Sequence, residues 1–188
     1  SDMLKEFAAL LTGDFDNRTQ YEEMKKNGRE DFPFARHKNT VCNDRISGLP
    51  EDFNGVFLLE ESYYTTKGSE HASPHLFLLK EEGEKIVLHS YDVPEGFDKN
   101  TFSAETFTGA PYDALHESAK FTPAVYEKKG DVWEGGSVSM FTPVLKFTLY
   151  ERFSEACLEV TEHMEVNGKR TFGYDEPIRY ERCPAEKG

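Results

Sequence analysis

The stretch that decides the fold, residues 57–95, reads FLLEESYYTTKGSEHASPHLFLLKEEGEKIVLHSYDVPE. It contains three runs with the two-residue period of β-strands, and polar turns separate them. In the first run, Val56–Tyr64, successive side chains would point to opposite faces. Whichever face is buried therefore carries one glutamate, Glu60 or Glu61, among large apolar residues. Because burying an unpaired carboxylate costs several kcal/mol, the inward glutamate is either paired or available to a ligand, which indicates a strand that lines a cavity.

Helices are expected only at the N-terminal end. Met3–Leu11 has the apolar spacing of an amphipathic helix, which Gly13 would end. Asp16 or Asn17 can cap a second helix, so the helical segment covers about residues 3–27. The rest of the chain is predicted to form strands over Phe34–Ile46, Gly55–Thr66, Pro74–Lys80, Lys85–Val93, Lys120–Lys128, Asp131–Gly135, Pro143–Phe153, Cys157–Val166 and Pro177–Cys183.

Many short strands joined by tight turns are typical of an antiparallel barrel or sandwich. The turn pairs include Glu82-Gly83, Lys129-Gly130 and Asn167-Gly168, and Asn-Gly is the strongest hairpin signal. A closed barrel has no unpaired edges, and about eight to ten strands leave room inside for one small ligand. We therefore predict an all-β fold, an antiparallel β-barrel with an N-terminal helix packed on it. The 188 residues most simply form a single domain.

Composition and charge exclude several classes of function. The net charge of −13 argues against binding to a phosphate backbone, which needs clustered lysine and arginine. The sequence has no GxSxG, GxGxxG or Walker motif, so hydrolase and nucleotide-binding chemistry have no support. The six histidines form neither an HxH nor an HExxH pair, so no metal site is expected.

Cysteine and hydropathy patterns bear on the compartment. Cys42, Cys157 and Cys183 lie far apart without a CxxC pair, which is typical of reduced thiols in a cytosol-like compartment, although one disulfide stays open. No run approaches the roughly 20 apolar residues that span a bilayer. We expect a cytoplasmic protein, or one of the plastid stroma if a targeting peptide was removed. Neither a membrane nor a nucleic acid is an expected partner, and a homodimer is an open alternative to a monomer.

Glu162 is a second carboxylate on an apolar stripe. In the expected strand Cys157–Val166, the alternate positions from Leu158 onward are apolar apart from Glu162. Glu162 either pairs with a buried arginine, lies near a barrel rim, or faces the cavity beside Glu60. Carboxylates in the cavity would suit a ligand whose N–H groups donate hydrogen bonds from the centre of an apolar body.

Aromatic and basic residues complete the set of candidates. Core packing explains any single aromatic residue of the predicted strands, whereas together they fit a pocket for a flat conjugated ligand. Arg45 and Arg179 lie at expected strand ends. There either arginine would bind a ligand carboxylate at an open mouth or make a surface salt bridge. The aromatic candidates are Tyr63, Tyr64, Tyr91, Tyr126, Tyr150 and Trp133.

Several motifs resemble those of the T-type phycobiliprotein lyases, the CpcT/CpeT family. Residues 60–63, EESY, resemble the E-Q-A-Y segment of the family, and residues 74–78, PHLFL, stand where its P-Y-R-Q-R strand follows. Residues 11–20, LTGDFDNRTQ, resemble its L-x-G-x-F-S/D-N-x-x-Q signature. Residues 45–50 resemble its R-x-x-P strand end, and residues 166–182 resemble its closing segment. The motifs follow one another in the order of the family.

The resemblance implies a lipocalin-like (calycin) barrel that acts as a chromophore lyase. Such a lyase binds an open-chain tetrapyrrole, a bilin, and assists its thioether attachment to a cysteine of a phycobiliprotein. The nucleophile then belongs to the acceptor, and no cofactor besides the bilin is implied. Glu60 would be the catalytic residue that holds or protonates the pyrrole nitrogens, while Tyr63, His75 and Tyr91 would shape the pocket. Leu76 and Leu78 stand where the family has arginines. This difference favours an alternative function, a non-catalytic barrel that binds a small apolar ligand.

Overall fold

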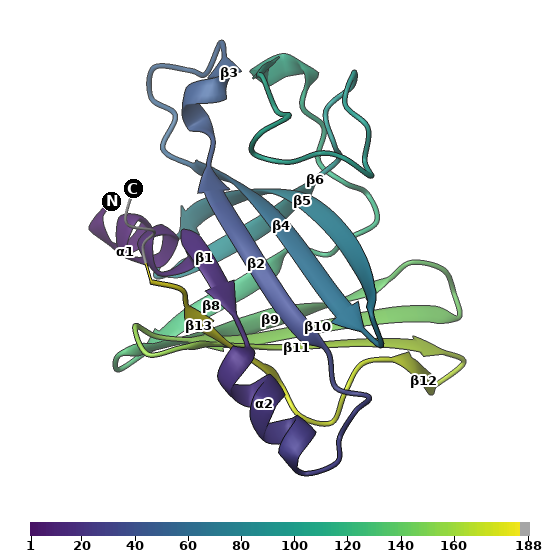
Figure 1. The fold of residues 1–188 in the computed structure, drawn as a ribbon. Helices are drawn as coiled ribbons and strands as arrows, with labels where there is room; N and C mark the ends of the chain where they lie inside the picture. Colours follow the sequence, from purple (N-terminus) through teal and green to yellow (C-terminus); the bar gives the residue numbers. More distant parts are fainter. Residues whose placement is uncertain (185–188) are drawn as a thin grey trace.

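Strands account for 49% of the structure, a computed structural model that describes residues 1–184 (Figure 1). The two helices are α1 (Asp2–Leu11) and α2 (Arg18–Lys26). The strands are β1 (Gly13–Asp16), β2 (Phe34–Val41), β3 (Ile46–Ser47), β4 (Val56–Thr66), β5 (Ser69–Glu82), β6 (Lys85–Tyr91), β7 (Ala110–Pro111), β8 (Ala124–Lys129), β9 (Val132–Met140), β10 (Leu145–Phe153), β11 (Leu158–Val166), β12 (Lys169–Phe172) and β13 (Ile178–Arg182).

Ten antiparallel strands close into a barrel. Their order is β10-β9-β8-β6-β5-β4-β2-β1-β13-β11, and pairing of β10 with β11 joins the two ends. β12 extends the sheet beyond β11, and β3 and β7 form a separate parallel pair. Closure leaves no unpaired edge among the ten strands. The expected all-β, lipocalin-like antiparallel barrel is therefore confirmed.

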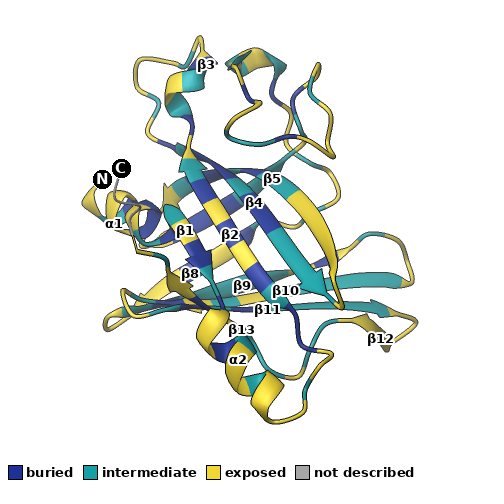
Figure 2. Cartoon of the chain, viewed as in Figure 1, coloured by how far each residue is buried: buried dark blue, intermediate teal, exposed yellow. Residues whose placement is uncertain are grey.

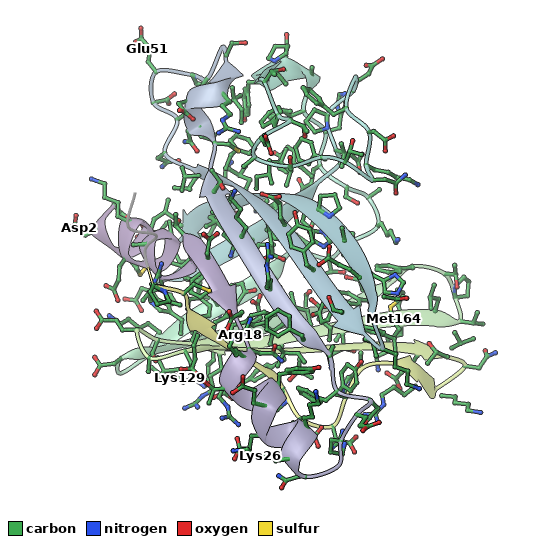
Figure 3. The ribbon with its side chains drawn as sticks, in the orientation of Figure 1. Asp2, Arg18, Lys26, Glu51, Lys129 and Met164 are labelled. Atoms are coloured by element: carbon green, nitrogen blue, oxygen red, sulfur yellow. The ribbon has the colours of Figure 1, made fainter. Side chains whose placement is uncertain are left out.

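Side chains alternate between the inside and outside of the barrel, as the strand period requires. Figure 2 shows buried and exposed positions alternating along β2, where Ala35, His37 and Asn39 are buried. Charged side chains such as Lys26, Glu51 and Lys129 are exposed and point away from the ribbon in Figure 3. The interior is thus defined by every second residue of each long strand.

The helix α1 closes one end of the barrel. The side chain of Ser1 caps it by accepting a hydrogen bond from the Leu4 amide. Phe7 is fully buried, with its ring centroid 5.0–5.1 Å from those of Tyr126, Trp133 and Phe153. These edge-to-face contacts join the helix to β8, β9 and β10. The predicted helix and its packing on the barrel are confirmed.

The second helix, α2, lies against β13. Its buried Gln20 donates a hydrogen bond to the Pro177 carbonyl and accepts one from the Arg179 amide, each 2.8 Å long. At the start of the helix, Asp16 accepts a hydrogen bond from the Arg18 amide. The two helices therefore connect the N-terminal segment to both the end and the wall of the barrel.

An irregular segment, residues 92–118, covers the outer face of β4 and β5. Its Phe102 and Phe107 belong to a second apolar core with outward-facing residues of these strands, among them Phe57 and Leu76. Arg45 donates hydrogen bonds to the carbonyls of Ala104 and Phe107 and so holds this cover in place. As a result, β4 is buried on both faces, and both of its glutamates lie beneath other parts of the chain.

Several elements differ from the expected ones: the strand expected over Phe34–Ile46 ends at Val41, β5 begins at Ser69 rather than Pro74, and the short strands β3 and β7 were not expected. β1 and β12 are strands that the sequence did not indicate, because each has only four residues. β9 continues past the expected end at Gly135 and runs through Gly136 to Met140. The glycines allow the strands to approach closely, since a Cβ atom at Gly135 would clash with the carbonyl of Val125.

All three predicted hairpins are present, although the central residues of two of them, Gly83-Glu84 and Gly130-Asp131, lie one position after the predicted pairs. Asn167 and Gly168 have φ values of 53° and 80°, the left-handed pair that a tight hairpin between β11 and β12 requires. All three cysteines are free thiols. Within residues 1–184, no helix is both long and apolar enough to cross a membrane.

Candidate ligand-binding cavity

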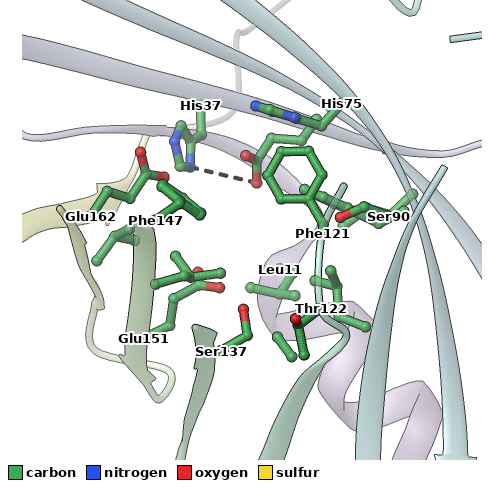
Figure 4. Close-up of a pocket in the computed structure, with 17 residues that line it drawn as sticks. Leu11, His37, His75, Ser90, Phe121, Thr122, Ser137, Phe147, Glu151 and Glu162 are labelled. Atoms are coloured by element: carbon green, nitrogen blue, oxygen red, sulfur yellow. Dashed lines mark ion pairs between the residues drawn. The ribbon is translucent and has the colours of Figure 1, made fainter. Parts of the chain in front are cut away.

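The barrel interior holds a cavity whose lining includes Leu11 of α1 and Thr122, both labelled in Figure 4. We take the exposed Thr122 to mark its mouth. The space inside the cavity that a water-sized sphere can occupy is about 60 Å³, and the non-atom space rises to about 690 Å³ when the part open to solvent is included. The remaining lining residues are His37, Leu58, Glu60, His75, Phe77, Leu88, Ser90, Phe121, Ala124, Ser137, Phe147, Leu149, Glu151, Val160 and Glu162.

Aromatic rings surround the mouth of the cavity. Phe121 and Phe147 line it, and Phe141 stacks on Phe147 with ring centroids 5.6 Å apart. Lys120 lies over this group, with Nζ 4.1 Å from the ring centroid of Phe141. The mouth therefore combines flat apolar surfaces with one exposed positive charge.

Three glutamates, Glu60, Glu151 and Glu162, face the cavity. Glu151 and Glu162 come from the paired strands β10 and β11, and Glu60 comes from β4 on the opposite wall of the closed barrel. Tyr126 donates a hydrogen bond to Glu151. Within residues 1–184, neither Glu60 nor Glu162 accepts a hydrogen bond, and none of the three pairs with a lysine or arginine.

The carboxyl groups resist ionisation. Burial raises the pKa of Glu151 to about 6, although the hydrogen bond from Tyr126 opposes the shift. Burial, and then the charge of Glu151, raise the pKa of Glu162 to about 7. Burial and the charges of the other two glutamates raise the pKa of Glu60 well above its ordinary value. Near neutral pH, the three groups therefore do not all carry a charge.

Two histidines lie among the carboxyl groups. His37 is only 3% exposed and stacks on Tyr180, with ring centroids 4.1 Å apart. Burial lowers its pKa to about 3, so the ring is neutral at physiological pH. Its Nδ1 lies 3.9 Å from Glu60 Oε2, which is too long for a hydrogen bond, and neither ring nitrogen has a hydrogen-bond partner in the described chain (dashed line in Figure 4).

His75 is the second neutral histidine. It stands opposite Glu60 in the β4–β5 register and stacks on Phe77, with ring centroids 5.4 Å apart. Burial lowers its pKa to about 4. A ring nitrogen, Nε2, lies 3.1 Å from Ser73 Oγ, so His75 has the hydrogen-bond partner that His37 lacks.

The structure brings together Glu60, His75 and Glu162 from the predicted site residues. Tyr63 lies on the outer face of β4, where its hydroxyl donates a hydrogen bond of 2.7 Å to Glu61. Tyr64 has its hydroxyl 3.5 Å from that of Tyr180 and packs beside the cavity without lining it. Strand alternation thus separates two residues that were predicted for one pocket: Glu60 points inward, whereas Tyr63 points outward and does not line the cavity.

Four other predicted ligand residues lie away from the cavity. Tyr91 packs edge-on against Phe57 under the outer cover, and Trp133 is fully buried against α1. Arg45 holds the cover, and Arg179 is exposed on β13. None of the four lines this cavity, because aromatic content and position at a strand end do not determine which face of a strand a side chain occupies.

The sequence analysis missed Glu151 and His37. Glu151 interrupts an apolar stripe formed by alternate residues of β10, the same signal that identified Glu60 and Glu162. His37 follows Ala35 at the two-residue spacing of β2, so it shares the inner face of that strand. The aromatic wall comes from Phe77, Phe121 and Phe147 rather than from the predicted tyrosines.

Within residues 1–184, no group of three or more histidine, cysteine, aspartate or glutamate side chains has the arrangement to hold a metal ion. Comparison with known proteins gave no match to a family model, a curated protein or a solved structure. The resemblance to T-type lyases therefore stays a prediction from the motifs.

Proposed function

We propose that the barrel binds one small ligand with a flat apolar body and N–H donors at its centre. The observation that carries the proposal is the set of three carboxyl groups on the cavity wall, none of which has a basic partner among the described residues. Buried polar groups of this kind cost stability unless something hydrogen-bonds to them. A ligand that donates hydrogen bonds would offset that cost.

An open-chain tetrapyrrole has the required chemistry. Its pyrrole N–H groups would face Glu60, Glu151 and Glu162, and its conjugated rings would lie against Phe77 and Phe147. Its propionates would be repelled by the carboxylates and would remain at the mouth. Lys120 is available there to bind them, in place of the predicted Arg45 and Arg179.

With a bilin bound, the chromophore-lyase activity implied by the motifs would be an addition reaction. The S–H group of an acceptor cysteine on a phycobiliprotein adds across a double bond of the A-ring side chain, forming the C–S bond without a leaving group. The barrel would orient the bilin and exclude water. Glu60, whose pKa burial raises well above its ordinary value, would hold or protonate the pyrrole nitrogens.

The second candidate function is a non-catalytic barrel that binds a small apolar ligand. Leu76 and Leu78, which stand where T-type lyases have arginines, are 1% and 2% exposed. They pack with Phe102 and Phe107 beneath the outer cover. An apolar core thus occupies the place of the basic pair in the motif, which favours ligand binding without attachment.

Absorption titration with phycocyanobilin tests the proposal. Wild-type protein is expected to give a saturable red shift, and Glu60→Gln is expected to weaken it by about tenfold in affinity, which corresponds to 1.4 kcal/mol. Glu70→Gln removes a charge from the exposed part of β5 and serves as the matched control. Saturable binding without attachment to an acceptor cysteine supports the non-catalytic barrel, and no spectral change excludes a bilin.

A further inference from the structure

We propose that the cavity selects ligands that carry a positive charge on an aromatic body, and that their binding releases protons from the glutamates. This inference rests on the proposed binding of a small ligand in the same cavity. It names the class of ligand, an aromatic cation such as a protonated amine or a cationic conjugated nitrogen.

The first observation is the sign of the charges on the cavity wall. Glu60, Glu151 and Glu162 are its acidic groups, and no lysine or arginine lines it within residues 1–184. A ligand with an anionic head would have to bury its charge beside carboxylates, which repel it strongly at low dielectric. A cation would instead replace the repulsion among the three glutamates with attraction.

The second observation is independent of the acidic groups. His37 is 97% buried by side-chain area and lines the cavity, yet neither of its ring nitrogens has a partner in the described chain. Its Nδ1 and Glu60 Oε2 are 3.9 Å apart. A ligand N–H group near this pair would give a donor to both acceptors, because the neutral imidazole has one nitrogen with a free lone pair.

The aromatic residues suit the same ligand. Phe77, Phe121 and Phe147 line the cavity, and the faces of phenylalanine rings attract cations. Lys120, the positive charge at the mouth, already lies over Phe141 on the solvent side. A cation bound deeper would meet only rings, carboxyl groups and neutral imidazoles.

The proton release follows from the groups that face the cavity. Burial raises the pKa of Glu60, Glu151 and Glu162, and repulsion from neighbouring glutamates raises it further for Glu60 and Glu162, so the set holds protons near neutral pH. A cation favours the ionised carboxylates, and the protons leave as it binds. The affinity for a cation of fixed charge must therefore rise with pH.

The other titratable groups around the cavity do not reverse this direction. His37 and His75 stay neutral above pH 6, because burial lowers their pKa values to about 3 and about 4. Tyr64, Tyr126 and Tyr180 pack around the same interior, and burial raises their pKa values, so they too stay neutral. Among the described residues that line the cavity, Glu151 and Glu162 therefore titrate in the range from pH 6 to pH 8, with pKa values of about 6 and about 7.

Three fluorescent probes test the inference. N-phenyl-1-naphthylamine is neutral, 8-anilinonaphthalene-1-sulfonate is the same skeleton with a negative charge, and thioflavin T is an aromatic cation. We expect thioflavin T to bind at least about tenfold more tightly than the sulfonate at pH 7. Its affinity should rise at least about threefold per pH unit from pH 6 to pH 8, while that of the neutral probe stays constant.

Variants and competition distinguish the cavity from the acidic surface. Glu162→Gln should reduce thioflavin T affinity and its pH dependence, whereas the surface control Glu70→Gln should change neither. If Glu162→Gln does not fold, Glu151→Gln provides the same test. Mutual displacement of thioflavin T and the neutral probe at about 0.5 M salt, where surface charges are screened, is expected for a shared cavity.

The remaining outcomes separate the two proposals. Tight binding of the neutral or anionic probe with no preference for thioflavin T overturns cation selection and leaves the barrel as a binder of small ligands. Thioflavin T affinity that is independent of pH overturns proton release. If none of the three probes is bound in the cavity, both this inference and the proposed ligand binding are wrong.

Discussion

Glu60 and Glu61 are neighbours on β4, but they occupy opposite faces of the strand and have opposite surroundings. Glu61 lies beneath the outer cover at 6% exposure. It accepts hydrogen bonds of 2.7 Å from the Tyr63 hydroxyl and 3.3 Å from the Ala104 amide. Glu60 faces the cavity, where its Oε2 lies 3.9 Å from Nδ1 of His37. Glu61 thus accepts hydrogen bonds on the outer face of β4, whereas Glu60 accepts none from residues 1–184 on the inner face.

The different surroundings of Glu61 and Glu60 indicate different roles, a structural one for Glu61 and the proposed ligand-binding one for Glu60. Glu61 connects the barrel wall to the cover through Ala104, so its partners account for its burial. Glu60 has no such partner in the described chain, and its burial alone costs stability. The ligand binding proposed above would account for the unpartnered carboxyl group of Glu60 in the cavity.

The largest effect is expected from Glu61→Ala. It removes both hydrogen bonds and leaves the Ala104 amide without this acceptor beneath the cover. Hydrogen bonds to charged groups contribute roughly 1.5–3 kcal/mol, so we expect a loss of about 2–3 kcal/mol in the free energy of unfolding. Urea denaturation at pH 7 measures it. A loss below about 0.5 kcal/mol would mean that Glu61 is not a structural residue and would remove the contrast with Glu60.

The next effect is the pH dependence of wild-type stability. The glutamates of the cavity have raised pKa values in the folded state, so the folded protein holds more protons than the unfolded chain once pH exceeds about 4.5. Their contribution is full below that pH and is lost as pH rises through about 6 and about 7, the pKa values of Glu151 and Glu162.

His37 and His75 act in the opposite direction, but only in acid. Their pKa values are lowered in the folded state, so their contribution is present above pH 6.5 and is lost as pH falls toward about 4 and about 3. Between pH 6.5 and pH 8, only the glutamates act, and we expect stability to fall by about 1 kcal/mol per pH unit. Urea denaturation at both values measures it, and stability that rises over this range would show that the cavity carboxyl groups are paired.

Glu60→Gln is expected to have a smaller effect of the opposite sign to Glu61→Ala. Glutamine keeps the shape and cannot ionise, so we expect a gain of up to about 1 kcal/mol at pH 8 and almost none at pH 5. Thermal and urea unfolding at the two pH values measure it, with Glu61→Gln as the matched change on the outer face. A loss above about 1 kcal/mol would instead identify Glu60 as a member of a structural pair.

The sequence predicted the parts of this arrangement that depend on alternation within one strand. It placed Glu60 and Tyr63 on opposite faces, and it identified Glu162 from an interrupted apolar stripe. It could not predict which face of β4 is the inner one, because residues 92–118 bury the outer face as well. Both faces of β4 therefore carry apolar residues at alternate positions, and the sequence pattern does not distinguish the inner face from the outer one.

Contacts between distant segments account for the failures. Trp133 lies against α1, and Arg45 binds the carbonyls of a segment about 60 residues away. No local pattern encodes either contact, since both depend on how the barrel closes and what covers it. Glu151 was predictable from its stripe alone, whereas its proximity to Glu60 requires the closed barrel.

The smallest effect at neutral pH is expected from His37→Phe. Phenylalanine keeps the stack on Tyr180 and removes two unpartnered ring nitrogens, so the free energy of unfolding at pH 7 should change by less than about 1 kcal/mol. At pH 5 the variant should be the more stable protein, because the unfolded wild-type chain gains a proton at this histidine and the folded one does not. Urea denaturation at pH 5 and pH 7 measures both. A loss of several kcal/mol at pH 7 would show that His37 has a partner, and the cavity would then lack the free acceptor beside Glu60 on which its contrast with Glu61 depends.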